Sequence, residues 1–311
     1  MIQTVSKTFF SALAGSSTLK DLASRYGMRG HKSFARRFIA GETVEEAIDA
    51  ARTVEATGML QTLDLLGESV ASMAEADVAT RAYLDVVEKI VRAGIGRNIS
   101  LKLTQLGLTI DRATCVDNLR RILDAAAKHD FFVRIDMENS PFTQVTLDVF
   151  EIMWQQGYRN AGVVLQSCLP RSVADARRMN ELGARVRIVK GAYKEPRAVA
   201  YQDKAQVDAA YMEIAQLLLT GGTYPAVATH DPAMIAATRA HAAQHGIAPD
   251  RFEFQMLYGI RRDLQAQLTA DGFRVRVYVP FGREWFPYFM RRLGERPANI
   301  SFVIRGILRE Q

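Results

Sequence analysis

The sequence has little cysteine and no long apolar run. Its only two cysteines, Cys115 and Cys168, lie far apart and form no CxxC pair. Such sparse use of cysteine is typical of a protein from a reducing compartment. No apolar stretch approaches the roughly 20 residues that a bilayer-spanning helix needs, and residues 1–15 make a poor signal peptide. We therefore expect a cytoplasmic protein, whose only membrane contact would be peripheral, at the inner face of the cell membrane.

Charge blocks, low-complexity tracts and Pro/Gly-rich linkers are also absent. Forty basic and 34 acidic residues give a formal net charge of +6, but the two signs are interleaved along the chain. A nucleic-acid surface is usually a clustered basic patch, so we expect no nucleic-acid partner. Anionic substrates, cofactor phosphates or an anionic membrane surface explain the excess charge at least as well.

Eight short segments rich in Val, Ile, Leu and Phe are each followed by a helical pattern. They cover residues 59–65, 98–103, 131–135, 162–165, 184–189, 225–228, 251–256 and 273–279, and amphipathic stretches include 42–56, 77–93, 113–128 and 203–219. Pro232 and Pro287 lie where helices can begin, and Pro297 where the last one can end. Strict alternation of eight such units predicts a closed α/β barrel of the (βα)8, TIM-like type. An open doubly wound sheet is the alternative, which the lack of a GxGxxG motif after the first segment disfavours.

The chain is expected to divide into an N-terminal helical arm, residues 1–40, and a barrel domain, residues 41–311. The arm carries a basic stretch from His31 to Arg37. We interpret it as a lid or packing arm with a solvated charge run, and a helix on a membrane surface is the alternative.

Polar residues end all eight predicted strands, at the face where a (βα)8 barrel places its chemistry. They are Asp64 with Glu68 beyond it, Lys102, Asp136, Gln166, Arg187 with Lys190, Thr229 to Asp231, Gln255 and Tyr278. Any one of them could cap a helix or pair with a neighbour. A purely structural barrel has no need of so many at one face, and the basic members indicate a small anionic substrate.

The segment 282–297 (GREWFPYFMRRLGERP) predicts a last helix with two adjacent arginines. Arg291 and Glu295 are four residues apart and can pair on one helix face. Arg292 is rotated from Arg291 by about 100°. Two neighbouring guanidinium groups can converge on one carboxylate, and an ordinary charged surface helix is the alternative.

Taken together, these residues resemble the flavin-dependent proline dehydrogenases. The resemblance spans residues 64–305 and rests on RIVKGAY at 187–193, Thr229-His230, FQML at 254–257, Tyr278 and the arginine-rich last helix. The chain has no room for the aldehyde dehydrogenase domain of the bifunctional proline utilisation proteins, so we expect a bacterial monofunctional enzyme. The resemblance implies a distorted barrel with FAD at the strand ends and a final helix over the mouth.

The resemblance also implies the reaction and the substrate site. L-Proline would be oxidised to Δ1-pyrroline-5-carboxylate by hydride transfer from ring C5 to flavin N5, with electrons passed to a quinone. Lys102, Arg291 and Arg292 would hold the proline carboxylate, and Tyr278 and Leu257 would pack on its ring. Asp136 would support the lysine and the flavin edge. Glu68 would pair with Arg291 as a gate, in competition with Glu295. The retained tyrosine favours proline over hydroxyproline.

The implied cofactor site follows the same strand ends. FAD would be lined by Asp136, Gln166, Arg187, Val189, Lys190, Gly191, Ala192, Tyr193, Thr229, His230, Gln255 and Glu295. Arg187 would lie near flavin N5, Lys190 and His230 would offset pyrophosphate charge, and Gly191 would let backbone approach the cofactor. The chain departs from the family at Asn139, where relatives often have a second acid, and at Lys194-Glu195.

Two other functions fit a barrel with polar strand ends. One is a flavin-free Schiff-base aldolase or lyase with Lys102 or Lys190 as nucleophile, which leaves the arginine pair and Tyr278 unexplained. The other is a catalytically silent binding barrel. No set of metal ligands is assigned under any of these hypotheses.

Overall fold

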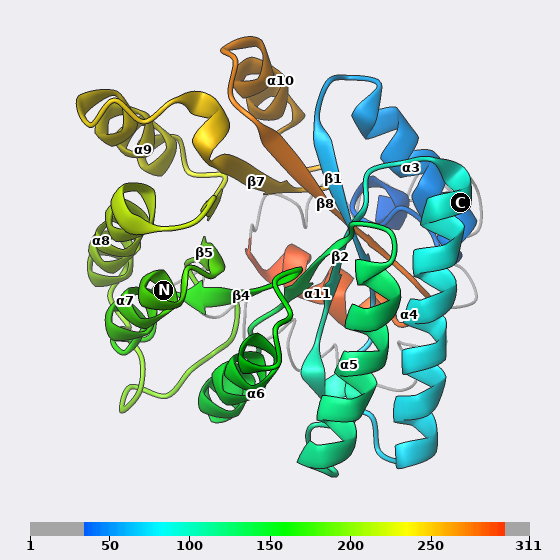
Figure 1. Cartoon of the computed structure of the whole chain (residues 1–311). Coiled ribbons are helices and arrows are strands. Elements are labelled where there is room, and N and C mark those ends of the chain that lie inside the picture. Colours follow the sequence, from blue (N-terminus) through cyan, green and yellow to red (C-terminus); the bar gives the residue numbers. More distant parts are fainter. Residues whose placement is uncertain (1–33, 296–311) are drawn as a thin grey trace.

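The computed structural model describes residues 34–295, and the side chains of residues 35–292. Eight parallel strands pair in chain order, and the last pairs back to the first, which closes a barrel (Figure 1). They are β1 (Leu60–Leu65), β2 (Asn98–Leu101), β3 (Phe132–Ile135), β4 (Ala161–Gln166), β5 (Arg185–Val189), β6 (Ala226–Ala228), β7 (Glu253–Leu257) and β8 (Val275–Phe281). The eight predicted strands and the (βα)8 barrel are confirmed, and the open sheet is wrong.

Helices surround this barrel and cover its outer wall. The α-helices are α3 (Val44–Glu55), α4 (Met73–Ala93), α5 (Arg112–Ala127), α6 (Thr143–Gln155), α7 (Ser172–Leu182), α8 (Lys204–Gly221), α9 (Pro232–Gln244), α10 (Arg262–Ala270) and α11 (Trp285–Glu295). Short 3-10 turns are η1 (Phe34–Arg37), η2 (Leu103–Leu106), η3 (Ser140–Phe142) and η4 (Pro249–Arg251). No helix within residues 34–295 is both long enough and apolar enough to cross a membrane.

Local capping chemistry explains where two of these helices begin. Asp231 caps α9 by accepting a hydrogen bond from the backbone of Ala233, and Pro232 occupies the first helical position as predicted. Helix α4 begins at Met73, four residues before the predicted start. The Ser72 side chain accepts from the Glu75 backbone N–H there, a Ser-x-x-Glu signal that the helical periodicity alone does not reveal.

The last helix departs from the regular barrel pattern. Helix α3, which precedes the first strand, packs against β1 and β8 on the outer wall. This frees α11 from that position, and Figure 1 shows it inside the ring of outer helices. Because Arg291 and Arg292 line a cavity at the strand ends, α11 lies over the barrel mouth, as expected. It begins at Trp285, which puts Pro287 within the first turn, where backbone N–H groups lack helical partners.

The start of the described chain packs beneath this last helix. Ala35, Phe38 and Ile39 are buried in one apolar cluster with Trp285 and Phe289 of α11. Residues 1–33 of the predicted arm (residues 1–40) and Pro297 lie outside the described residues. The division into an arm and a barrel domain stays a prediction.

Candidate active site

A cavity of about 600 Å³ opens at the carboxyl ends of the strands. Its lining contains every predicted site residue except Glu68 and Glu295. The side chain of Glu295 lies outside the described residues. The predicted residues that line it are Lys102, Asp136, Gln166, Arg187, Val189, Lys190, Gly191, Ala192, Tyr193, Thr229, His230, Gln255, Leu257, Tyr278, Arg291 and Arg292. The barrel thus brings residues from seven strand ends and α11 to one space.

Lys102 is held beside two carboxylates at the ends of neighbouring strands. Its Nζ donates to both oxygens of Asp64 at 3.3 Å and lies 3.9 Å from Asp136 Oδ2. Burial opposes the lysine charge, but the charges of Asp64 and Asp136 outweigh it and raise the pKa of Lys102. The ammonium is therefore a fixed positive charge at neutral pH.

Asp136 joins three strands at the centre of the cavity wall. It accepts hydrogen bonds from Arg187 Nη1 and from the Tyr278 hydroxyl, both at 2.7 Å. The Arg187 guanidinium also lies 5.4 Å from the centre of the Tyr278 ring, within the range of a cation–π contact. The closer partners of Asp136 are Arg187 and Tyr278, and Asp64 is the carboxylate nearer to Lys102; the supporting role of Asp136 stays a prediction.

The arginines of α11 face the cavity from above. Arg291 Nη1 donates to Glu68 Oε1 at 2.9 Å, in the predicted pairing between the last helix and the loop after β1. Burial opposes the charge on Arg291, and the Glu68 carboxylate more than compensates, so the pKa of Arg291 is raised. The Arg292 guanidinium lies 5.1 Å from the centre of the Tyr288 ring.

The other side of the cavity follows the loops after β4 to β7. Lys190 Nζ lies 2.5 Å from Asp208 and 2.9 Å from Asp231, and its hydrogen bond to Asp231 lowers the pKa of that carboxyl. His230 Nε2 accepts a hydrogen bond from the Leu257 backbone N–H at 2.9 Å, which joins the ends of β6 and β7. Lys190 thus already has two acidic partners, a pairing that its position in RIVKGAY does not reveal.

Gly191 allows this loop to approach its neighbours closely. Its φ is +107°, in the region that favours glycine, and an added Cβ would collide with Cys168 Sγ. Any side chain here would displace the loop between Lys190 and Tyr193. The backbone at this point therefore depends on glycine.

Several residues of the lining are not assigned to the substrate or cofactor site by the sequence. They are Met137, Val164, Ala228, Asp231, Pro232, Met256, Arg261 and Tyr288. Tyr288 lies one turn before Arg291, so helical spacing could have found it. Arg261 follows a turn after β7 and adopts a left-handed φ of +49°, which no spacing rule predicts.

A comparison with protein-family models supports this geometry. The model described as "Proline dehydrogenase" matches residues 47–305. The chain belongs to the proline dehydrogenase family. Curated relatives match it over most of their length. It is 42% identical over 301 residues to "Proline dehydrogenase 1" of Bacillus subtilis strain 168, covering 97% of this chain and 98% of that protein. It is 43% identical over 281 residues to "Proline dehydrogenase" of Deinococcus radiodurans, covering 89% and 91%.

Larger proteins of the proline dehydrogenase family match only in part. The "Bifunctional protein PutA" of Escherichia coli K12 is 30% identical over 313 residues, covering 86% of this chain and 24% of that protein. A crystal structure of proline utilization A from Bdellovibrio bacteriovorus, inactivated by N-propargylglycine, superposes with a TM-score of 0.78 at 28% identity. The match covers 83% of this chain and 32% of that one, so the likeness is confined to one part of the larger protein.

Proposed function

We propose that the protein oxidises L-proline to Δ1-pyrroline-5-carboxylate in proline catabolism, with FAD as its cofactor and a quinone as the final electron acceptor. Membership of the family makes the chain an oxidoreductase acting on proline. FAD, when bound, would supply the acceptor for the hydride that leaves ring C5. The protein contributes binding, orientation and charge.

The arrangement of Lys102, Arg291 and Arg292 carries the proposal. Lys102, at the end of β2, and the two arginines of α11 line one cavity. The carboxylates beside Lys102 keep its amine protonated. Guanidinium groups can hold a carboxylate through two parallel N–H···O bonds. We assign these residues to the proline carboxylate.

The lining also suits an anionic cofactor. It contains six basic side chains (Lys102, Arg187, Lys190, Arg261, Arg291 and Arg292) against two acidic ones, Asp136 and Asp231. The volume of about 600 Å³ lies within the range of small-molecule and cofactor sites. Gly191 keeps the loop after β5 free of a side chain that would displace it. We assign FAD binding to Asp136, Gln166, Arg187, Val189, Lys190 to Tyr193, Thr229, His230, Gln255 and Glu295.

The remaining substrate contacts orient the ring. Tyr278 and Leu257 would pack against the pyrrolidine, and the bond from the Tyr278 hydroxyl to Asp136 holds the phenol ring in place. A substrate that is bound in a reactive geometry has already lost translational and rotational entropy, so the activation free energy of the chemical step is lower. We propose Asp136 as the residue that aligns Tyr278, Arg187 and Lys102 with one another.

Glu68 is proposed as a gate. Its bond to Arg291 joins the loop after β1 to α11 across the mouth, and side chains that are 31% and 22% exposed can separate at little cost. Opening the pair would free Arg291 for the proline carboxylate. Glu295 is the competing partner in this proposal.

The Schiff-base alternative is disfavoured by the state of its nucleophile. A catalytic lysine amine must be neutral to attack a carbonyl, and enzymes achieve this by lowering its pKa. Asp64 and Asp136 have the opposite effect on Lys102, and Lys190 lies between two carboxylates. Family membership also argues against a silent binding barrel.

The location of the reaction completes the proposal. A membrane quinone as acceptor requires the enzyme to meet the bilayer surface, so we propose a cytoplasmic protein with peripheral contact at the inner face of the cell membrane. Vesicle flotation with and without quinone would test this contact.

Anaerobic spectroscopy tests the proposed chemistry directly. The purified protein should be yellow, and L-proline should bleach the flavin absorbance without oxygen. D-Proline at the same concentration is the control. A colourless protein that FAD cannot reconstitute, or a flavin that L-proline leaves oxidised, would contradict the proposal.

A further inference from the structure

A second cavity, of about 640 Å³, lies at the opposite end of the barrel. It is lined by residues that open strands or directly precede them, among them Leu60 of β1, Arg185 of β5 and Arg274 before β8. Parallel strands put all such residues at one end, away from the mouth. No acidic residue is part of this lining, among the residues that the structure describes.

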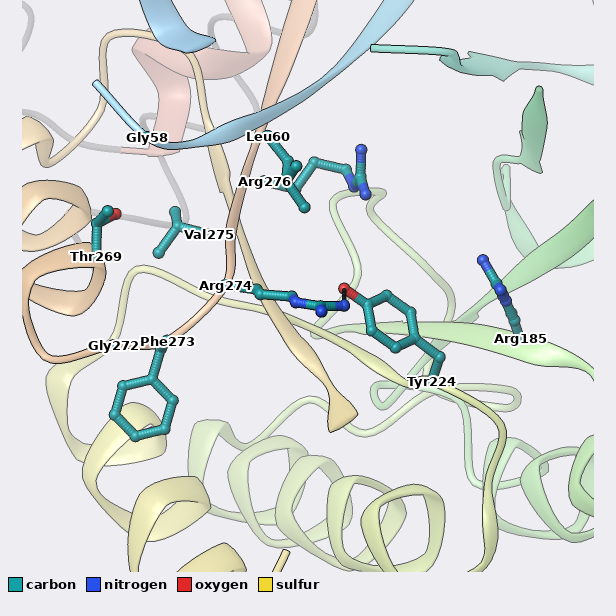
Figure 2. Close-up of a pocket in the computed structure, with 10 residues that line it drawn as sticks. All are labelled: Gly58, Leu60, Arg185, Tyr224, Thr269, Gly272, Phe273, Arg274, Val275 and Arg276. Carbon is teal, nitrogen blue, oxygen red and sulfur yellow. Dashed lines mark hydrogen bonds between the residues drawn. The ribbon is translucent and has the colours of Figure 1, made fainter. Parts of the chain in front are cut away.

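Two arginines of this cavity share one aromatic ring. Figure 2 shows the Tyr224 side chain between Arg274 and Arg185, whose guanidinium carbons lie 5.6 Å and 5.3 Å from its ring centre. Arg274 Nη1 also donates to the Tyr224 hydroxyl at 3.3 Å. Both arginines are exposed, and within residues 35–292 neither forms an ion pair with a carboxylate. Asp250 and Glu253 act on Arg274 only at longer range, so neither arginine has a carboxylate in direct contact among the described residues.

The third arginine of the lining is already neutralised. Arg276 makes two bonds to Glu253, at 2.8 Å and 3.0 Å, and a third to the Gln61 carbonyl. Glu253 Oε2 also accepts a hydrogen bond from the Tyr224 hydroxyl at 3.1 Å, whereas Glu253 acts on Arg274 only through its charge at longer range. Arg185 and Arg274 are therefore the two arginines of this lining without an ion-pair partner among the described residues.

A buried arginine behind the cavity adds to this charge. Arg134 is 3% exposed and donates to the carbonyls of Val163 and Arg185, with no carboxylate in contact among the described residues. Its guanidinium and that of Arg185 both lie over the Phe132 ring, at 4.8 Å and 5.0 Å. Three positive charges therefore gather behind and beside one open cavity.

The backbone at Tyr224 is also strained. Its φ is +46°, which is uncommon for an aromatic residue. Such strain persists only where the surroundings hold it, and it is frequent at ligand sites. Here it keeps the phenol ring between the two guanidinium groups.

We propose that this cavity is a second ligand site, which binds a small dianion through Arg185 and Arg274. Two guanidinium groups without carboxylate partners match two negative charges, and both phosphate and dicarboxylate groups accept paired N–H donors. The ligand is a phosphate or a small dicarboxylate. This site is independent of the proposed function because it shares no residue with the mouth cavity.

Calorimetric titration of the purified full-length protein tests the site. Inorganic phosphate, succinate and chloride are added in turn at constant ionic strength. A saturating carboxylate analogue of proline that cannot be oxidised occupies the mouth, so that anions do not bind there. We expect saturable binding of phosphate, succinate or both, and none of chloride. Which dianion binds then identifies the ligand chemistry.

The variant is Arg185→Gln with Arg274→Gln. It should raise the dissociation constant of the dianion by about tenfold or more, as expected for loss of charge-assisted hydrogen bonds. The matched control is Arg92→Gln with Arg177→Gln, which removes the same charge from two exposed arginines on α4 and α7. The control should bind like the wild type.

Two results would overturn the site: no saturable binding of either dianion, or equal weakening in the variant and the control. If the double variant does not fold, each single substitution replaces it, with a several-fold loss expected.

Discussion

The Lys102 ammonium lies 3.3 Å from each carboxylate oxygen of Asp64, and both side chains are buried at the mouth of the barrel. They come from neighbouring strands, since Asp64 pairs with Ser100 in the β1–β2 register and Lys102 follows two residues later. Burial raises the pKa of Asp64, and the nearby lysine charge opposes that rise. Asp64 therefore stabilises the positive charge of Lys102 that the proposed binding of the proline carboxylate requires.

Breaking this pair should cost stability. Asp64→Asn would leave the buried Lys102 charge with only the more distant Asp136, and removal of one partner from a buried ion pair typically costs about 3–5 kcal/mol. Urea unfolding measures the loss. The Asp64→Asn/Lys102→Met double variant should recover part of it, because no buried charge is then left alone. Additive losses in the two single variants would contradict the pairing.

The same variant should change the pH dependence of proline binding. In the wild type the carboxylates raise the pKa of Lys102, so its charge persists through the alkaline range. Without Asp64, burial acts with less opposition and the pKa of Lys102 falls. Loss of the Lys102 charge raises the KM for proline and so lowers kcat/KM. When kcat/KM is measured from about pH 6 to pH 10, this fall should begin at a lower pH in the variant than in the wild type. Superimposable profiles would argue against this role, and the exposed Asp49→Asn is the control.

Removing either arginine of α11 should weaken substrate binding. Arg291→Met or Arg292→Met would delete a charge-assisted hydrogen bond worth about 1.5–3 kcal/mol, which corresponds to a rise of roughly 10- to 150-fold in the KM for proline. Folding should change much less, because the methionine stem keeps part of the packing. Steady-state kinetics and thermal unfolding separate the two effects. Unchanged proline kinetics in both variants would rule out the assignment of Arg291 and Arg292 to the proline carboxylate.

Glu68→Gln should affect the gate more than the fold. The pair with Arg291 is partly exposed, and such pairs typically contribute less than about 1 kcal/mol to stability. The substitution should leave the melting temperature nearly unchanged and make proline binding more dependent on salt, since binding then forms a new ion pair instead of replacing the one with Glu68. Stopped-flow binding at two salt concentrations checks this. An equal salt dependence in both proteins would exclude gating by this pair.

Gly191→Ala should impair cofactor retention. Its positive φ and the collision with Cys168 Sγ would displace the loop between Lys190 and Tyr193. We expect a lower flavin content per chain, measured by absorbance after gel filtration. Gly246→Ala is the matched control, because that glycine also has a positive φ but has open space around its Cβ position. A full flavin complement in Gly191→Ala would contradict the assignment.

Much of the fold could be predicted because strand and helix periodicities are local. The eight apolar segments and the helix start at Pro232 follow from neighbouring residues. Helix α4 begins earlier than its helical periodicity indicates, because the cap residue Ser72 precedes the apolar pattern. The position of α11 over the mouth followed from the family resemblance, and its physical cause is that α3 occupies the outer wall beside β1 and β8.

The candidate site was predictable as a set of residues, because parallel strands bring their carboxyl ends to one face. Its pairings were not. Asp136 is expected beside Lys102, yet it makes shorter bonds to Arg187 and Tyr278. Which carboxylate pairs with a given cation depends on differences of less than 1 Å between strands, and no sequence spacing contains that information.

The sequence by itself determined the alternation of strands and helices, the polar strand ends and the two adjacent arginines, since each depends on residues close along the chain. Only the tertiary structure decided that Asp64 holds Lys102, that Glu68 reaches Arg291, and that Arg185 and Arg274 share the ring of Tyr224. These contacts join residues 38 or more positions apart. Burial and competition among charges select the partners, and both exist only once the barrel has closed.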